Sequence, residues 1–193
     1  MKNLEAVELL LNRNSMRFLT SPAPSEQELA KALQAGVAAP DHGRLTPWRF
    51  KVVRQENIKN FVDFAFKVRQ NSDKPFDDEK IAAVRQWLDE VPLIIAVGCH
   101  IDYDAKIPES ERMIAAGCAV MNIINALHMM GYGVFWSTGI ATYMDDFQVG
   151  LGFDPLDYRF MGFLCVGTPK MPIPVKTRAS YLDFTEEWTA PQA

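Results

Sequence analysis

Two arginines flank a hydroxyl group near the start of the chain, in the segment NRNSMRF at residues 12–18. Arg13, Ser15 and Arg17 alternate there, so an extended backbone would place all three side chains on one side. The planar guanidinium group carries several donors that match phosphate and carboxylate. The pattern indicates a site for an anionic group, and the simpler alternative is a solvated basic turn.

A second polar passage lies between two prolines in AAPDHGRLTPWRF, residues 38–50. Proline disfavours helical geometry at the residue before it, so a helix is expected to end ahead of Pro40. Three polar residues follow this proline: Asp41, His42 and Arg44. We expect a short loop that reaches toward a ligand, with a surface loop anchored by Trp48 as the alternative.

A third passage, FWSTG at residues 135–139, carries a strand into small polar residues. Backbone N–H groups at such a junction are free to face a ligand, and Gly139 would permit close approach. Ordinary turn and capping chemistry is the alternative. Thr142 with Asp145 fits the cap of a following helix.

Other common chemistries leave no pattern in the chain. Gly131 and Gly133 precede a strand and lack the third glycine of a dinucleotide fingerprint. His42, His100 and His128 are far apart, and no carboxylate is spaced as a co-ligand, so no metal site is expected. The three polar passages are therefore the remaining candidates.

Composition argues against several classes of protein. The net charge is −4 and no basic stripe is present, so nucleic-acid binding is not expected. The longest apolar run, residues 113–130, is interrupted by Asn122, Asn125 and His128, which favours a buried helix over a membrane span. Three widely spaced cysteines indicate free thiols in a reducing compartment, and we expect a cytoplasmic protein.

The rest of the chain predicts one domain with a central sheet between helices. Ser25 and Glu28 form a capping-box pattern, and Gly131 suits the end of the longest helix. The expected helices cover residues 4–12, 26–38, 56–69, a stretch after 80 to about 90, 109–130 and a short stretch after 142. The expected strands cover residues 48–53, 92–99, 133–139 and 158–169, of which the second and fourth read as buried. The polar segment 69–80 is expected to be the most mobile.

In this order the passages resemble the family of FMN-dependent nitroreductases, in particular its compact NAD(P)H nitroreductase members. RNSMR matches the Arg-x-Ser-x-Arg/Lys pattern that follows a first helix, and AAPDHGRLTPWRF matches the Ala-Pro loop and the Pro-Trp pair before a strand. A central helix rich in small residues and a late VG-x-P strand end also match, so the similarity covers residues 4 to about 178. It implies an α+β fold, a nitroreductase-like mixed sheet flanked by helices in one domain over residues 1–193, and a homodimer with interlocked subunits.

The resemblance implies how one FMN would be held. Its ribityl phosphate would be bound by three consecutive residues, Arg13, Asn14 and Ser15. Arg17 would approach the flavin pyrimidine ring, where a cation favours the negatively charged hydroquinone. A late basic residue, Lys176 or Arg178, could also serve the phosphate.

Two further groups of residues are implied to complete this site. The loop after the Ala-Pro pair would reach the flavin of the other subunit with Pro40, Asp41, His42 and Arg44. The strand end would line the isoalloxazine with Trp136, Ser137, Thr138 and Gly139, and one of its backbone amides would hydrogen-bond near N5.

The implied activity consists of two half-reactions at one site. NAD(P)H passes hydride to flavin N5 and leaves, and a nitroaromatic or similar small-molecule acceptor takes its place. Protons can come from water, so no catalytic residue is named. Two alternatives stay open: quinone or activated-alkene reduction or dehalogenation at the same flavin, and a non-catalytic flavin-binding or scaffold dimer. The aromatic tail YLDFTEEWTA is expected to wrap the partner subunit.

Overall fold

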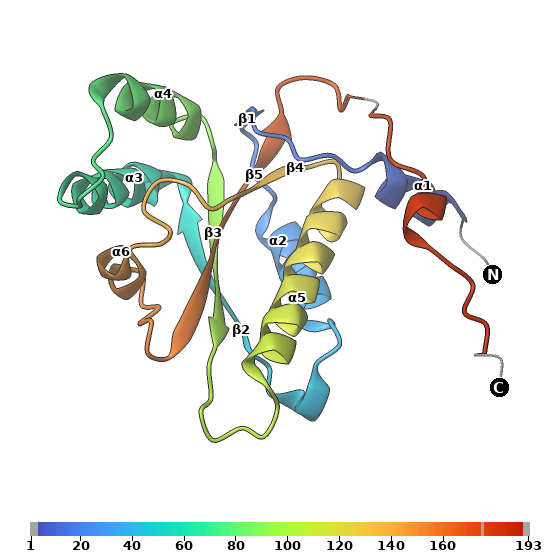
Figure 1. Cartoon of the computed structure of the whole chain (residues 1–193). Helices are drawn as coiled ribbons and strands as arrows, with labels where there is room; N and C mark the ends of the chain where they lie inside the picture. The colour runs from blue at the N-terminus through green and yellow to red at the C-terminus, as the bar shows by residue number, and fades with distance from the viewer. Residues whose placement is uncertain (1–3, 175, 191–193) are drawn as a thin grey trace.

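The computed structural model describes residues 4–174 and 176–190, and its centre is a five-stranded sheet (Figure 1). β5 (Tyr158–Pro169) pairs with β3 (Leu93–His100), β4 (Gly133–Ser137) and β1 (Leu19–Thr20), and β3 also pairs with the outer strand β2 (Trp48–Arg54). All of these pairs are antiparallel, and one parallel bridge joins Ser15 to Val134. The expected α+β fold with a mixed sheet is confirmed.

Helices cover both faces of this sheet (Figure 1). On one face lie α3 (Gln55–Gln70), α4 (Asp78–Leu88) and α6 (Asp145–Gly150), and on the other lie α2 (Glu26–Val37) and the long α5 (Glu109–Met129). Alternate residues of β3 therefore enter different cores: Ile94 packs on the α3 side, while Leu93 and Ile95 pack on the α5 side. This double burial explains why the strand is one continuous apolar run.

Local sequence signals set the helix ends as expected. Ser25 and Glu28 make both hydrogen bonds of a capping box at the start of α2. After α5, Gly131 adopts the left-handed conformation with a φ of 89°, which glycine tolerates best. The two-residue strand β1 was not expected, because its pairing of Leu19 with Pro169 joins distant parts of the chain.

Among the described residues, α5 is the one helix long and apolar enough to cross a membrane. Half of its most apolar window is buried inside the domain, where the helix packs against α2 and the sheet. Two of its polar residues bond within the chain: the Asn122 amide donates to the carbonyl of Ala35 over 3.1 Å, and His128 Nε2 lies 3.0 Å from the carbonyl oxygen of Leu9. The helix is therefore the expected buried core helix.

Two segments extend away from the body of the domain: α1 (Leu4–Asn12) and the C-terminal tail, which contains the short helix η2 (Tyr181–Phe184) (Figure 1). No residue of α1 is buried, and its apolar side chains Leu4 and Leu11 are 71% and 59% exposed. In the tail, Phe184 and Trp188 are 77% and 83% exposed.

Candidate functional site

The first polar passage lies against β4, which fixes the direction of its side chains. Met16 donates its backbone N–H to the carbonyl of Val134 over 3.0 Å. Asn14 and Met16 are buried, while Arg13, Ser15 and Arg17 point outward, so the expected alternation is confirmed.

Glycine at the start of β4 permits this close approach. A Cβ on Gly133 would lie 2.6 Å from Leu19 Cδ2 and 3.0 Å from Met16 Cβ. Any larger residue would push the first passage away from the strand.

Two arginines meet at the start of this passage. Arg178 donates from Nη2 to the carbonyl of Arg13 and lies 3.5 Å from Asn14 Oδ1. Burial lowers the pKa of the Arg13 guanidinium from its usual value, and the positive charge of Arg178 lowers that pKa further. No ion pair within residues 4–174 and 176–190 includes either arginine, so two cations stand together without a carboxylate.

The buried Asn14 anchors the C-terminal segment beside these cations. Its amide donates to the carbonyl of Pro174 over 2.8 Å and to that of Asn12 over 3.1 Å. A cavity of about 400 Å³ opens next to it, and Lys176 and Arg178 contribute to its wall. The late basic residues expected from the sequence are thus both placed beside the first passage.

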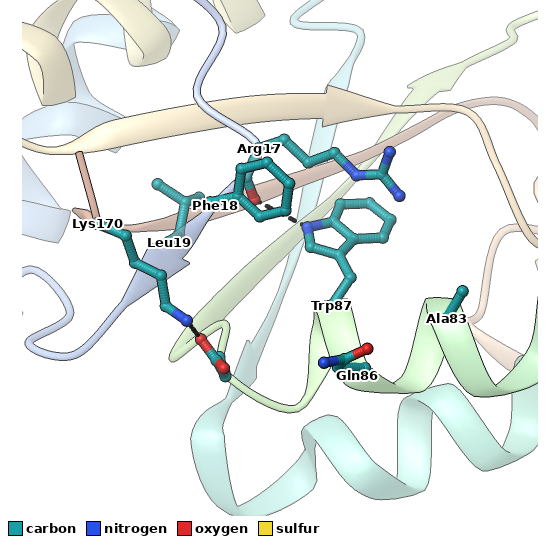
Figure 2. A pocket seen from close by; sticks show the side chains of 8 residues that line it. Arg17, Phe18, Leu19, Ala83, Gln86, Trp87 and Lys170 are labelled. Atoms are coloured by element: carbon teal, nitrogen blue, oxygen red, sulfur yellow. Dashed lines mark hydrogen bonds and ion pairs between the residues drawn. The ribbon is translucent and has the colours of Figure 1, made fainter. Parts of the chain in front are cut away.

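At the other end of the passage, Arg17 lies over the ring of Trp87 from α4 (Figure 2). Two further cavities, of about 350 and 450 Å³, share Arg17 and Phe18 in their walls. The first cavity is also lined by Trp87 and by Lys170, which is ion-paired with Glu90. Arg17 takes part in no ion pair between described residues, so it offers a free positive charge to both cavities.

The third passage continues β4 into a tight turn. The buried Ser137 accepts a hydrogen bond on Oγ from the N–H of Gly139 over 3.2 Å. Thr142 donates its hydroxyl to the carbonyl of Gly139, so the cap expected from Thr142 is wrong, and α6 begins after Met144 without a side-chain cap. Thr138 and Gly139 remain exposed.

Trp136 lies on the same strand and is 38% exposed, with its indole N–H donated to the carbonyl of Met161 over 2.8 Å. Below the turn, Gly162 has a φ of 90°, and a Cβ there would lie 2.3 Å from the carbonyl oxygen of Ser137. The lack of a side chain at Gly162 of β5 therefore leaves room for the carbonyl of Ser137 at the turn.

The second passage lies at the opposite end of α5 from the first passage within one chain. Its short helix η1 (His42–Arg44) packs at the N-terminal end of α5, where His42 Nδ1 is 2.6 Å from a Glu111 carboxylate oxygen. Asp41 accepts the backbone N–H of Thr46 over 2.6 Å, which closes the loop. His128 marks the opposite end of α5, near Asn14 and α1, and at about 1.5 Å per residue the two ends are about 25 Å apart. One chain does not bring the Pro40–Arg44 loop to the arginines.

Backbone strain coincides with the second and third passages. Arg44, Thr46 and Ile140 are the only non-glycine residues with positive φ in the part of the chain that the structure describes, at 57°, 44° and 56°. Such conformations cost free energy and are frequent at functional sites.

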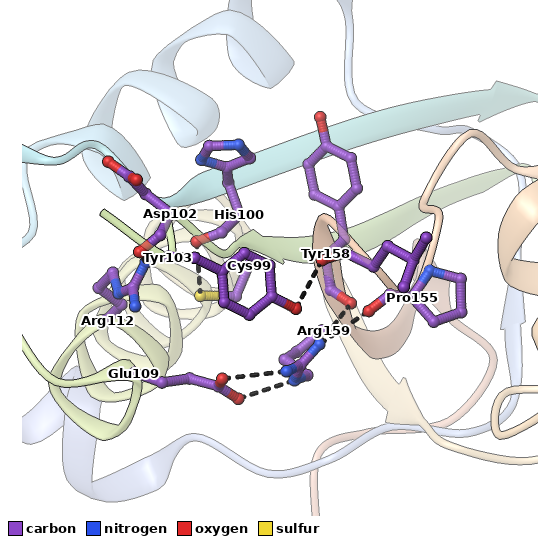
Figure 3. Close-up of polar contacts among 10 residues, drawn as sticks. Cys99, His100, Asp102, Tyr103, Glu109, Arg112, Pro155, Tyr158 and Arg159 are labelled. Carbon is purple, nitrogen blue, oxygen red and sulfur yellow. Dashed lines mark hydrogen bonds and ion pairs between the residues drawn. The ribbon is translucent and has the colours of Figure 1, made fainter. Parts of the chain in front are cut away.

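A polar cluster after β3 holds the start of α5 in place (Figure 3). Glu109 accepts two hydrogen bonds from the Arg159 guanidinium, over 2.7 and 3.0 Å, and this bonding raises the pKa of Arg159. The nearly buried Arg112 donates to the carbonyl of Asp102 over 2.8 Å. Cys99 is fully buried, and burial raises the pKa of its thiol to about 11, which favours the unreactive thiol form. Residues 4–174 and 176–190 contain no group of three or more His, Cys, Asp or Glu side chains that could hold a metal ion.

Comparisons with known proteins identify the family of the chain. The family model described as "Nitroreductase family" matches residues 10–168. The Escherichia coli K12 protein named "Putative NAD(P)H nitroreductase YdjA" is 34% identical over 171 residues, covering 87% of this chain and 90% of that protein. The chain therefore belongs to the nitroreductase family.

Solved structures support the same fold. A nitroreductase-like family protein from Bacillus cereus superposes with a TM-score of 0.82 at 22% identity, covering 98% of this chain and 99% of the other. An NADPH:FMN oxidoreductase from Vibrio harveyi, complexed with NAD⁺, gives a TM-score of 0.72 at 17% identity and covers 97% of this chain and 79% of that one.

Two residues at the site, Trp87 and Phe18, were not predicted from the sequence. Trp87 occupies one position in an otherwise ordinary amphipathic helix and meets Arg17 across 70 residues of chain, so no local spacing signals the contact. Phe18 follows directly on Arg17, and an aromatic residue next to a predicted anion site is the signal that could have identified it; the structure leaves it 53% exposed.

Proposed function

We propose that this chain is an FMN-dependent NAD(P)H oxidoreductase that reduces nitroaromatic or similar acceptors in two half-reactions at one site. The observation that carries the proposal is the pair of unneutralised cations, Arg13 and Arg178, beside Lys176. Arg13 belongs to the motif that, by the resemblance, would bind the FMN phosphate, and Arg178 contacts it. The relatives named above are described as an NAD(P)H nitroreductase and an NADPH:FMN oxidoreductase.

The residues present fit a flavin phosphate. A bound dianion would offset the electrostatic repulsion between the guanidinium groups of Arg13 and Arg178. Each guanidinium group also offers paired donors for phosphate oxygens. The exposed Ser15 adds a hydroxyl on the same side, while Asn14 is occupied by main-chain carbonyls and holds the segment in place. The proposed phosphate ligands are thus Arg13, Ser15, Arg178 and Lys176, with Asn14 beside them.

The remaining residues would orient the ring. Arg17 supplies a free positive charge for its pyrimidine edge, and Trp136, Ser137, Thr138 and Gly139 form the wall at the end of β4. Bound FMN supplies the hydride chemistry: it accepts a hydride from NAD(P)H and gives it to the acceptor. The chain provides orientation and electrostatics, so no side chain is assigned as a catalytic acid or base.

We propose that the working form is a homodimer. The loop residues Pro40, Asp41, His42 and Arg44 lie at the opposite end of α5 from Arg178, and the two helix ends are about 25 Å apart by helix rise, so the loop would complete the site of the partner. The exposed apolar residues of α1 and of the tail are the surfaces that a partner would cover. The three cysteines are free thiols, which fits a cytoplasmic enzyme.

A visible spectrum of the purified protein tests the proposal. We expect flavin absorption, release of FMN on denaturation, anaerobic bleaching by NADPH or NADH, and reoxidation by a nitroaromatic compound. Parallel reoxidation with a quinone, an activated alkene and a halogenated phenol separates the acceptor classes. A colourless dimer that cannot be reconstituted with FMN would instead support a scaffold.

A further inference from the structure

Trp87 holds Arg17 at two points (Figure 2). The Arg17 guanidinium carbon lies 4.6 Å from the centroid of the indole ring, a cation–π arrangement. The indole N–H donates to the backbone carbonyl of Arg17 over 2.8 Å. The tryptophan therefore contacts both the charged end and the main chain of the same residue.

Trp87 is itself fixed by its surroundings. Its ring meets Phe135 of β4 edge to face, with centroids 5.5 Å apart. The next residue, Leu88, is fully buried and anchors the end of α4 in the core. The indole is thus a rigid platform between the helix and the strand that carries the predicted flavin wall.

Arg17 has few other restraints. It makes no ion pair with a described residue and its side chain is exposed. A free arginine side chain samples many rotamers, and restricting it costs entropy each time a ligand binds. A ring that already holds the guanidinium reduces this cost and fixes where the charge lies.

We propose that Trp87 is a positioning residue that fixes the Arg17 cation at the cavity edge and thereby tunes the reduction potential of the bound flavin. The inference rests on the proposed function, in which Arg17 faces the flavin pyrimidine. A fixed cation there favours the reduced, negatively charged ring, so loss of the platform makes the flavin harder to reduce.

A double-mutant cycle on the holoprotein tests this role. Trp87→Leu is expected to weaken FMN binding about three- to tenfold and to favour the oxidised flavin by a similar factor, which is about 14–30 mV for a two-electron couple. Trp87→Phe, which keeps a ring face, is expected to shift the potential less. In Arg17→Gln protein the further change Trp87→Leu is expected to leave the flavin potential unchanged, because the cation it positions is gone, although the indole hydrogen bond to the main chain of residue 17 is still lost.

Phe76→Leu is the matched control. Phe76 precedes α4 and stacks on two other cations, Arg69 at 4.5 Å and Lys80 at 4.1 Å. Its loss removes an aromatic ring and a cation–π contact from the same region, yet we expect an unchanged flavin potential. An unchanged potential in Trp87→Leu, or equal shifts from Trp87→Leu with and without Arg17, would overturn the inference.

A measurement on the flavin-free protein separates this inference from the proposed function. In the NMR spectrum the Arg17 Hε is expected to be shifted by the indole ring current, and Trp87→Leu is expected to abolish that shift. If the protein binds no FMN but the shift is present, the proposed function fails and the Arg17–Trp87 pairing stands. Absence of the shift in the unchanged protein would refute the pairing, whatever the flavin does.

Discussion

Replacing Arg178 with glutamine tests whether the paired cations recognise a phosphate. In the ligand-free protein, Arg178 contributes repulsion to Arg13 and hydrogen bonds to an exposed carbonyl, so its net effect on folding is small. A charged hydrogen bond to a phosphate contributes about 1.5–3 kcal/mol. With about 1.4 kcal/mol per tenfold, Arg178→Gln should weaken FMN binding about 10- to 150-fold.

Riboflavin supplies the sharp comparison, because it carries the same ring without the phosphate. Fluorescence titration of the flavin-free protein should show a large loss of FMN affinity and an unchanged riboflavin affinity. Arg54→Gln is the control: it removes the same charge from an arginine paired with Glu26, and we expect no change for either ligand. Equal losses for FMN and riboflavin, or less than about a twofold change for FMN, would refute phosphate recognition by Arg178.

Three other predictions follow from the fold. Ending the chain after Ala179 should weaken the proposed dimer, measured by sedimentation; unchanged association would count against a tail that wraps the partner. Gly162→Ala should lower the free energy of unfolding by about 2 kcal/mol or more, because φ is 90° and the new Cβ meets Ser137; thermal melts that match the unchanged protein would contradict this. The Cys99 thiol has its pKa raised from 9.0 to about 11 in the folded protein, so the free energy of unfolding should fall as pH rises from about 9 to about 11. In urea titrations this fall should be shallower for Cys99→Ala, and an equally steep fall would contradict the assignment.

Features determined within a few residues of chain were predictable. The capping box of Ser25 and Glu28 and the left-handed Gly131 set helix ends by local hydrogen bonds and backbone conformation, and both are confirmed. The double burial of β3 was readable because a strand covered on both faces needs apolar residues at every position. The helix cap expected from Thr142 is wrong because α6 begins later, after Met144. The Thr142 hydroxyl donates to the carbonyl of Gly139 in the preceding turn instead.

The three passages that carry the candidate site were predictable from the sequence, but how they lie relative to one another was not. Alternation placed Arg13, Ser15 and Arg17 on one side correctly, since it depends only on extended backbone. The contact of Arg17 with Trp87 joins positions 70 apart, and that of His42 with Glu111 joins positions 69 apart. Such contacts are set by tertiary packing, which local spacing does not encode. The roles of the individual residues toward a flavin stay predictions.

The arginine passage and the Pro40–Arg44 loop lie at opposite ends of α5, so the proposed flavin binding would depend on the proposed dimer. The arginines lie near the C-terminal end of this helix and the Pro40–Arg44 loop near its N-terminal end, with the bidentate Glu109–Arg159 pair fixing the latter. Because this 21-residue helix packs against α2 and the sheet, its two ends stay about 25 Å apart in one chain. A second chain running in the opposite direction would place a loop at each arginine cluster, and its surface would cover the apolar α1 and tail. A ligand that contacts both chains then stabilises the dimer by mass action, so flavin release and subunit dissociation should occur together.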